Sequence, residues 1–120
     1  MIDSLYKEII LDHYRNPRNF GHLEKPTHVG ALHNPFCGDR IRVEMAVENG
    51  EISDIRFSGE GCVLSIASGS LLTEFVKNKN TGIIAELSPE TLVSLLGIEV
   101  SPVRLKCVLL PLDVLKKLTS

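Results

Sequence analysis

Several features that mark common functional classes are missing from this chain of 120 residues. Its 13 basic residues are outnumbered by 15 acidic ones and are dispersed, so the concentrated positive charge of a nucleic-acid-binding protein is lacking. No apolar run is long enough to span a bilayer, and residues 1–4 do not begin a basic stretch followed by an apolar one. We therefore expect a cytoplasmic protein with neither nucleic acid nor membrane as a partner.

Internal boundaries are missing as well. The sequence contains no repeat, no low-complexity tract and no linker. Its length suits one domain of ordinary size, and a hydrophobic content of 43% is enough to build a core. We predict one domain over residues 1–120.

Cysteine is scarce, with three residues at positions 37, 62 and 107. Three thiols cannot all pair in intramolecular disulfides, and a cytoplasmic compartment keeps thiols reduced. No C-x-x-C pair is present, since 24 residues separate Cys37 from Cys62 and 44 separate Cys62 from Cys107. By spacing alone, three inert buried cysteines and three members of a metal or sulfur site are both compatible with the sequence.

The region 41–57 has the clearest β pattern. Apolar and polar residues alternate over 41–47, with Glu44 among the residues on the polar face, which predicts a half-buried strand. Asn49-Gly50 suits the positive φ angles of a type I′ turn, and residues 52–57 form the returning strand. We predict a β-hairpin over 41–57 within a small antiparallel sheet of about three strands.

Helical patterns occur on both sides of this hairpin. Residues 3–14 form a predicted amphipathic helix that ends at Asn16-Pro17, and residues 20–34 are predicted to be irregular or extended. Apolar residues at spacings of three and four predict a buried core helix from about Cys62 to about Asn78. The expected fold is α+β, with one face of the sheet covered by helices and a metal site at one end of the sheet.

Two prolines open predicted helices, and a third complicates the last one. Ser88-Pro89-Glu90 and Ser101-Pro102 each combine an N-cap residue with a first-turn proline, and the final helix runs towards Lys117. Pro111 cannot donate a helical hydrogen bond to the Cys107 carbonyl, so this helix is expected to start late or to kink, with mobility near Cys107. The alternative is that Pro111 occupies the first turn of the terminal helix.

The residues beside the cysteines suit metal or sulfur chemistry. Gly38 and Gly61 allow a backbone to approach a metal closely, and the predicted helix after Cys62 favours its thiolate through the helix dipole. Asp39 adds an oxygen ligand. Three thiolates and one carboxylate would complete a tetrahedral zinc site, and they would equally hold the outward positions of a 2Fe-2S cluster.

Both kinds of centre would remain negatively charged, so nearby cations are expected. The candidates are Arg40, Arg104 and Lys106. The Lys106 ammonium could favour the Cys107 thiolate or pair with Asp39 when no metal is bound. The alternative is that all three cations are ordinary solvated surface charges.

Two other chemistries have weaker support. His33 lies four residues before Cys37 and could replace Asp39 as a ligand, but histidine also occurs elsewhere in this third of the chain. Ser65 and Ser68 have no G-x-S-x-G motif and no identifiable base, so we expect them to cap or pack a helix rather than to act in a hydrolase.

Four ordered motifs together resemble the U-type iron-sulfur cluster scaffold family, known as IscU, SufU and the N-terminal domain of NifU. The motifs are Asp12-His13-Tyr14-Arg15-Asn16-Pro17-Arg18-Asn19, Cys37-Gly38-Asp39, Gly61-Cys62 with Ser65-Ile66-Ala67-Ser68, and Pro102-Val103-Arg104-Leu105-Lys106-Cys107. The resemblance implies that Cys37, Asp39, Cys62 and Cys107 hold a nascent 2Fe-2S cluster or a zinc ion. It also implies that a cysteine desulfurase delivers sulfur as a persulfide.

The chain departs from both main branches of this family. The IscU branch usually has histidine before the third cysteine, where this chain has Lys106, as the SufU branch does. The SufU branch has an extra segment between the second and third cysteines, and the interval here is too short to contain it. The Leu-Pro-Pro-Val-Lys peptide with which IscU recruits an Hsp70-type chaperone corresponds to residues 100–104, whose sequence differs, so dependence on a chaperone stays open.

Three functions are consistent with these features. The first is a non-enzymatic scaffold that receives Fe²⁺ and persulfide sulfur, assembles a transient 2Fe-2S cluster and passes it to apoproteins such as ferredoxins. The second is a zinc-dependent sulfurtransferase that relays persulfide sulfur, and the third is a domain with a purely structural zinc ion. Cys107 is the favoured persulfide acceptor and Cys37 the second choice. We expect a monomer or a weak homo-oligomer.

Overall fold

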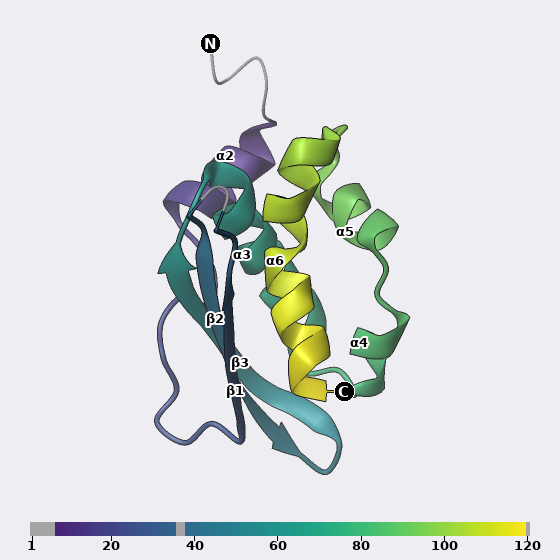
Figure 1. The fold of residues 1–120 in the computed structure, drawn as a ribbon. Coiled ribbons are helices and arrows are strands. Elements are labelled where there is room, and N and C mark those ends of the chain that lie inside the picture. The colour runs from purple at the N-terminus through teal and green to yellow at the C-terminus, as the bar shows by residue number, and fades with distance from the viewer. Residues whose placement is uncertain (1–6, 36–37, 120) are drawn as a thin grey trace.

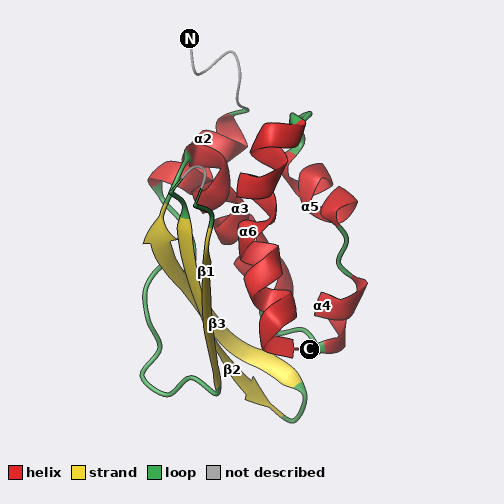
Figure 2. Cartoon of the chain, in the orientation of Figure 1, coloured by secondary structure: helices red, strands yellow, loops and turns green. Residues whose placement is uncertain are grey.

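An antiparallel sheet forms one layer of the structure, a computed structural model that describes residues 7–35 and 38–119. Its strands are β1 (His28–His33), β2 (Arg40–Glu48) and β3 (Glu51–Glu60), hydrogen-bonded in the order β1-β2-β3. The helices lie against one face of this sheet (Figures 1 and 2). They are α2 (Glu8–Arg15), α3 (Val63–Val76), α4 (Gly82–Glu86), α5 (Pro89–Leu96) and α6 (Pro102–Thr119). The predicted α+β fold is confirmed.

The predicted hairpin is formed by β2 and β3. Asn49 and Gly50 have φ angles of 54° and 80°, as the predicted type I′ turn requires. The register between the two strands shifts at Ala46/Val47, which is a β-bulge. Because of this bulge, Ile52 and Ile55 are both fully buried although three positions separate them.

Helix α3 lies in the core, as its apolar pattern predicts. It is followed along the chain by α4, which the sequence pattern did not predict, and by α5, whose predicted N-cap Ser88 accepts a hydrogen bond from the Thr91 amide at 3.2 Å. The buried apolar side chains of the sheet, α3, α5 and α6 belong to one cluster. This cluster fixes where the first turns of α3 and α6 lie relative to the end of the sheet.

The last helix differs from its prediction. Helix α6 begins at Pro102 and continues through Pro111, which is buried within it, so the expected late start is wrong, and so is the alternative of a first-turn position for this proline. Cys107 therefore lies within the second turn of this helix. The kink at Pro111 and the mobility near Cys107 stay predictions. The segment 20–34, predicted to be irregular or extended, contains the regular strand β1.

The first predicted helix is α2, which begins at Glu8, and residues 1–6 lie outside the described part of the chain. Polar contacts attach the segment after α2 to the core. His13 Nδ1 lies 2.6 Å from Ser70 Oγ, which also accepts a hydrogen bond from the Arg18 amide at 2.9 Å. Burial is the main reason why the pKa of His13 is lowered, so the imidazole is neutral at pH 7.

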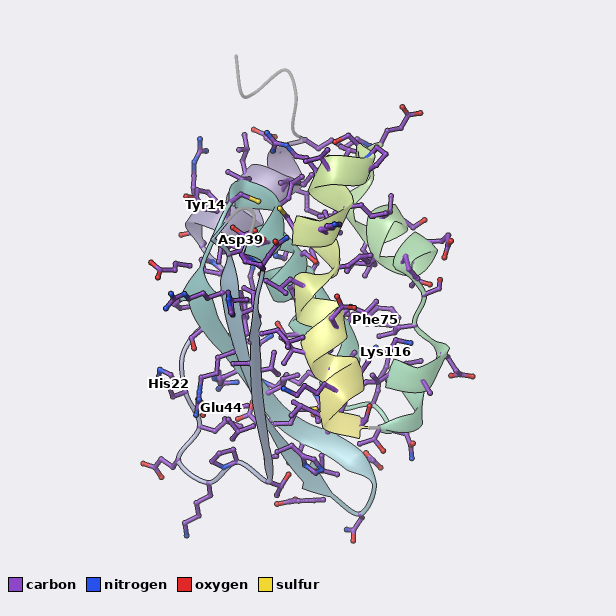
Figure 3. The ribbon with its side chains drawn as sticks, in the orientation of Figure 1. Tyr14, His22, Asp39, Glu44, Phe75 and Lys116 are labelled. Carbon is purple, nitrogen blue, oxygen red and sulfur yellow. The ribbon has the colours of Figure 1, made fainter. Side chains whose placement is uncertain are left out.

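Glu44 was predicted on the polar face of its strand, but it is 4% exposed. The segment between α2 and β1 crosses this face, where the Leu23 amide donates to Glu44 Oε1 at 2.9 Å and His22 Nδ1 lies 2.6 Å from Oε2. Figure 3 shows His22 and Glu44 close together, away from the end of the sheet where Asp39 lies.

In the part of the chain that is described, no helix is both long enough and apolar enough to cross a membrane.

Candidate metal centre

Three side chains with metal-ligating atoms converge at one end of the sheet. Asp39 lies just before β2, Cys62 just before α3, and Cys107 in the second turn of α6. One carboxylate oxygen of Asp39 and the two sulfur atoms all lie within 4.8 Å of one another. Zinc–sulfur bonds of about 2.3 Å would place two thiolates of a tetrahedral site roughly 3.8 Å apart. The three ligands therefore fit a small metal centre after a contraction of at most about 1 Å.

The backbone around residues 34–39 brings Asp39 to this position. The Gly38 amide donates to the Asn34 carbonyl at 2.8 Å, and the Asn34 amide donates to the Asp39 carbonyl at 2.8 Å. Gly38 has a φ angle of +76°, which residues with a β-carbon rarely adopt. Gly38 permits the turn that presents Asp39, and its predicted role in close approach of the backbone to a metal stays a prediction.

Asp39 also caps helix α3. Its Oδ1 accepts a hydrogen bond from the Cys62 amide at 3.1 Å, and its Oδ2 accepts a short hydrogen bond from the Ser65 hydroxyl. Cys62 is the N-cap residue of α3 and makes no side-chain cap of its own, so Asp39 supplies the cap from another segment. The positive end of the helix dipole stabilises this carboxylate, which is 2% exposed.

Gly61 provides the space that the Asp39 carboxyl group occupies. A β-carbon on Gly61 would lie 2.9 Å from Asp39 Cγ and 2.9 Å from Asp39 Oδ1. Any side chain at this position would push the carboxylate away from Cys62. Gly61 thus leaves room for the candidate ligand Asp39, and its predicted role in close approach of the backbone to a metal stays a prediction.

The two serines of α3 contact helix α6. Ser65 Oγ donates to the Cys107 carbonyl at 3.1 Å, and Ser68 Oγ donates to the Val108 carbonyl at 2.6 Å. Both serines are fully buried. We predicted that both serines pack or cap a helix, but not that Ser65 contacts all three described candidate ligands, since its Oγ also lies 3.7 Å from Cys62 Sγ.

A pocket of about 670 Å³ opens beside the two described cysteines. The described residues that line it are Asn34, Cys62, Pro102, Val103, Arg104, Lys106 and Cys107. Two of the three predicted cations, Arg104 and Lys106, thus lie at the pocket. Arg40 lines a different pocket, together with His33 and Arg42. Cys107 is only 7% exposed, so the pocket gives its buried sulfur a route to the surface.

The remaining predicted site residues are placed as follows. Cys37 lies outside the described residues, and its predicted role as a ligand stays a prediction. His33 is exposed, pairs with Arg40 in the β1–β2 ladder, and does not belong to the group of Asp39, Cys62 and Cys107.

Comparison with known proteins identifies the family to which this chain belongs. The profile described as NifU-like N terminal domain matches residues 5–119. The Zinc-dependent sulfurtransferase SufU of Bacillus subtilis is 35% identical over 133 residues, covering 97% of this chain and 90% of the relative. The iron-sulfur cluster assembly scaffold protein IscU of Haemophilus influenzae is 37% identical over 115 residues, covering 92% of this chain and 90% of the relative.

Solved structures agree in fold. The SufU protein of Fervidobacterium islandicum, described as a candidate iron-sulfur cluster assembly scaffold, superposes with a TM-score of 0.83 at 22% identity, covering 98% of each chain. A NifU-like protein (N-terminal) from Brucella abortus superposes with a TM-score of 0.80 at 20% identity, covering 98% of this chain and 94% of the other. At such identities the likeness concerns the fold alone. The sequence matches carry the assignment: the chain belongs to the NifU-like N-terminal domain family and has IscU and SufU homologues over most of its length.

Proposed function

We propose that this protein is an iron-sulfur cluster assembly scaffold that builds a transient 2Fe-2S cluster and passes it to acceptor apoproteins. One observation carries the proposal: Asp39, Cys62 and Cys107 place their ligating atoms within 4.8 Å of one another beside an open pocket. Cys37, from the motif Cys37-Gly38-Asp39, is the proposed fourth ligand. Three thiolates and one carboxylate suit iron in a cluster, and they also suit zinc in the same place.

Sulfur would arrive as the persulfide of a cysteine desulfurase. The Cys107 thiolate attacks the outer sulfur of that persulfide, the sulfur–sulfur bond of the donor breaks, and the donor cysteine leaves as a thiolate. The product is a persulfide on Cys107. Reducing its outer sulfur to the sulfide of a cluster requires two electrons from an external reductant. Cys107 is the preferred acceptor because it borders the pocket together with Arg104 and Lys106, and Cys37 is the second choice.

Asp39 supports release of the cluster. A carboxylate is a harder ligand than a thiolate and exchanges more readily on iron. In this chain the carboxylate also has protein donors, the Cys62 amide and the Ser65 hydroxyl, which satisfy it when the cluster has left. The empty site is therefore a stable end point of transfer.

A second function, the zinc-dependent relay of persulfide sulfur, has support of its own. Lys106 stands before Cys107 where the IscU branch usually has histidine, and the B. subtilis relative is named a zinc-dependent sulfurtransferase. The alignment with that relative spans 133 residues, more than the 120 of this chain, so the relative contains residues that this chain lacks. The resemblance to the relay branch is thus partial, and the scaffold remains the first proposal.

An anaerobic reconstitution tests these functions. The apo and the zinc-loaded protein are each incubated with a cysteine desulfurase, cysteine, ferrous iron and a reductant, while visible absorption and intact mass are recorded. A chromophore that moves to apoferredoxin supports the scaffold. A mass gain of one sulfur in the zinc-loaded protein, without a transferable chromophore, supports the relay.

A third result would contradict both functions. If the protein binds zinc, gains no sulfur and forms no chromophore, its zinc ion is structural. Cys62→Ser and Cys107→Ser should then unfold the protein, and removal of zinc should unfold the parent as well, because a structural zinc site supplies folding free energy.

A further inference from the structure

Ser65 joins the two sides of the candidate metal centre. It is fully buried in the first turn of α3, and its Oγ is within hydrogen-bond distance of Asp39 Oδ2 and of the Cys107 carbonyl oxygen. The same Oγ lies 3.7 Å from Cys62 Sγ. One neutral side chain thus contacts all three described candidate ligands: the carboxylate of Asp39, the sulfur of Cys62 and the backbone of Cys107.

The serine hydroxyl carries a single hydrogen, which the two oxygen acceptors share. The Asp39 carboxylate and, at 3.1 Å, the Cys107 carbonyl both lie within its reach, while in the contact with Cys62 Sγ either atom can be the donor. Because both oxygen contacts involve the same atom, the position of Asp39 is linked to that of the Cys107 backbone.

Pro111 explains why the Cys107 carbonyl turns towards Ser65. In a regular helix this carbonyl would accept a hydrogen bond from the amide of residue 111, and proline has no amide hydrogen. The proline ring also crowds the carbonyl four residues before it. Ser65 donates to this carbonyl from α3, and Ser68 donates in the same way to the neighbouring Val108 carbonyl.

We propose that Ser65 is a positioning residue of the metal centre: its buried hydroxyl, held between the Asp39 carboxylate and the Cys107 carbonyl, sets the separation of these two ligands. The proposal rests on the proposed function only in that the site binds a metal ion. Groups that hydrogen-bond a ligating carboxylate orient it, and their loss typically lowers metal affinity about 10-fold to 100-fold.

Ser68 offers a matched control. It is buried to the same degree in the same helix and donates to the adjacent carbonyl of α6, that of Val108, which is not a candidate ligand. Zinc affinity is measured by competition with a chromophoric chelator for the parent, Ser65→Ala and Ser68→Ala. We expect Ser65→Ala to weaken zinc binding about tenfold or more and Ser68→Ala to stay within about twofold of the parent.

Cobalt(II) provides a spectroscopic signal that a change in protein stability alone would not alter. The visible ligand-field bands of the cobalt-loaded protein depend on the geometry of its ligands. Ser65→Ala should shift or weaken these bands, because Asp39 is no longer held and the contact with Cys62 Sγ is lost, and Ser68→Ala should leave them at their parental positions.

Pro111→Ala separates the contact to Asp39 from the contact to Cys107. This variant restores an amide that can donate to the Cys107 carbonyl within α6. Ser65→Ala should raise the unfolding equilibrium constant of the apo protein about tenfold with proline at position 111, and clearly less with alanine there. The loss of zinc affinity caused by Ser65→Ala should persist in both backgrounds, since the Asp39 contact is lost in both.

The outcomes are distinct. Equal zinc affinities for Ser65→Ala and Ser68→Ala, or unchanged cobalt bands in Ser65→Ala, would overturn the positioning role even if the protein assembles clusters. A parent that binds neither zinc nor cobalt would overturn the proposed function and the positioning role together. Zinc binding that depends on Ser65, in a protein that transfers no cluster and no sulfur, would support the positioning role and contradict the proposed function.

Discussion

Asp39 combines two roles in one carboxyl group. It caps helix α3 through the Cys62 amide and the Ser65 hydroxyl, and it presents an oxygen to the same space as two cysteine sulfurs. A helix cap is satisfied in the absence of metal, whereas an unpaired buried carboxylate would not be. Asp39 therefore suits the proposed role of a ligand that releases its metal.

Replacing this carboxylate tests its part in release. We expect Asp39→Ala to slow the transfer of a reconstituted 2Fe-2S cluster to apoferredoxin several-fold, because the most exchangeable ligand is lost. Circular dichroism of the cluster follows the transfer. Asp113→Ala, which removes an exposed carboxylate from α6, serves as the control. Equal transfer rates for Asp39→Ala and the parent would refute this role.

Gly61 can be tested independently of any transfer. In Gly61→Ala the new β-carbon would lie 2.9 Å from Asp39 Cγ, so the carboxylate must move. We expect zinc affinity to fall about tenfold, as for other groups that orient a ligand. Gly82→Ala is the control, since its β-carbon would meet only the exposed side chain of Asn80, at 3.1 Å. If Gly61→Ala and Gly82→Ala bind zinc with equal affinity, this role of Gly61 is contradicted.

The elements differ in how far local sequence predicts them. The hairpin depends on period-two alternation and on Asn49-Gly50, and α5 depends on a serine cap followed by proline, so both follow from neighbouring residues. Helix α6 does not, because a proline inside a helix is normally a reason to end it. The core contacts of α6 and the serine donors from α3 allow α6 to continue through Pro111, and these come from distant parts of the chain.

The N-cap of α5 can be tested with a single substitution. Ser88→Ala removes the acceptor of the Thr91 amide, so we expect the free energy of unfolding to fall by about 1 kcal/mol. Ser94→Ala, an exposed serine in the same helix, should leave stability unchanged or slightly raised, because alanine is the better helix former. Urea unfolding of both variants measures the difference. An equal effect of the two substitutions would show that Ser88 does not act as a cap.

For the whole molecule, acid stability should depend on Glu44, far from the candidate metal centre. The hydrogen bond with His22, followed by that from the Leu23 amide, lowers the pKa of Glu44 from 4.5 to about 2. A carboxyl group with a lowered pKa in the folded state contributes stability that is complete above its unfolded pKa. That contribution is lost as pH falls from 4.5 towards 2.

We expect the apo protein to lose up to about 2 kcal/mol of stability through this group between pH 5 and pH 2, in addition to losses from other acids. Glu44→Gln should be less stable than the parent at pH 6, and the difference should shrink as pH falls through this range. Urea unfolding at a series of pH values measures both effects. Glu48→Gln, at the exposed end of the same strand, should keep the pH dependence of the parent. A constant difference between Glu44→Gln and the parent would contradict the assignment.

The hairpin, the capped helices and the family follow from the amino-acid sequence alone, since alternation, turn residues and short motifs are local properties of the chain. The sequence also singled out Asp39, Cys62 and Cys107 as candidate ligands, through their neighbours. Tertiary packing brings these three within 4.8 Å of one another and makes Asp39 the cap of α3. It likewise decided that Ser65 links Asp39 to the Cys107 carbonyl and that Glu44 is buried. These contacts join residues more than twenty positions apart, and their geometry depends on how the sheet, α3 and α6 pack around a common core.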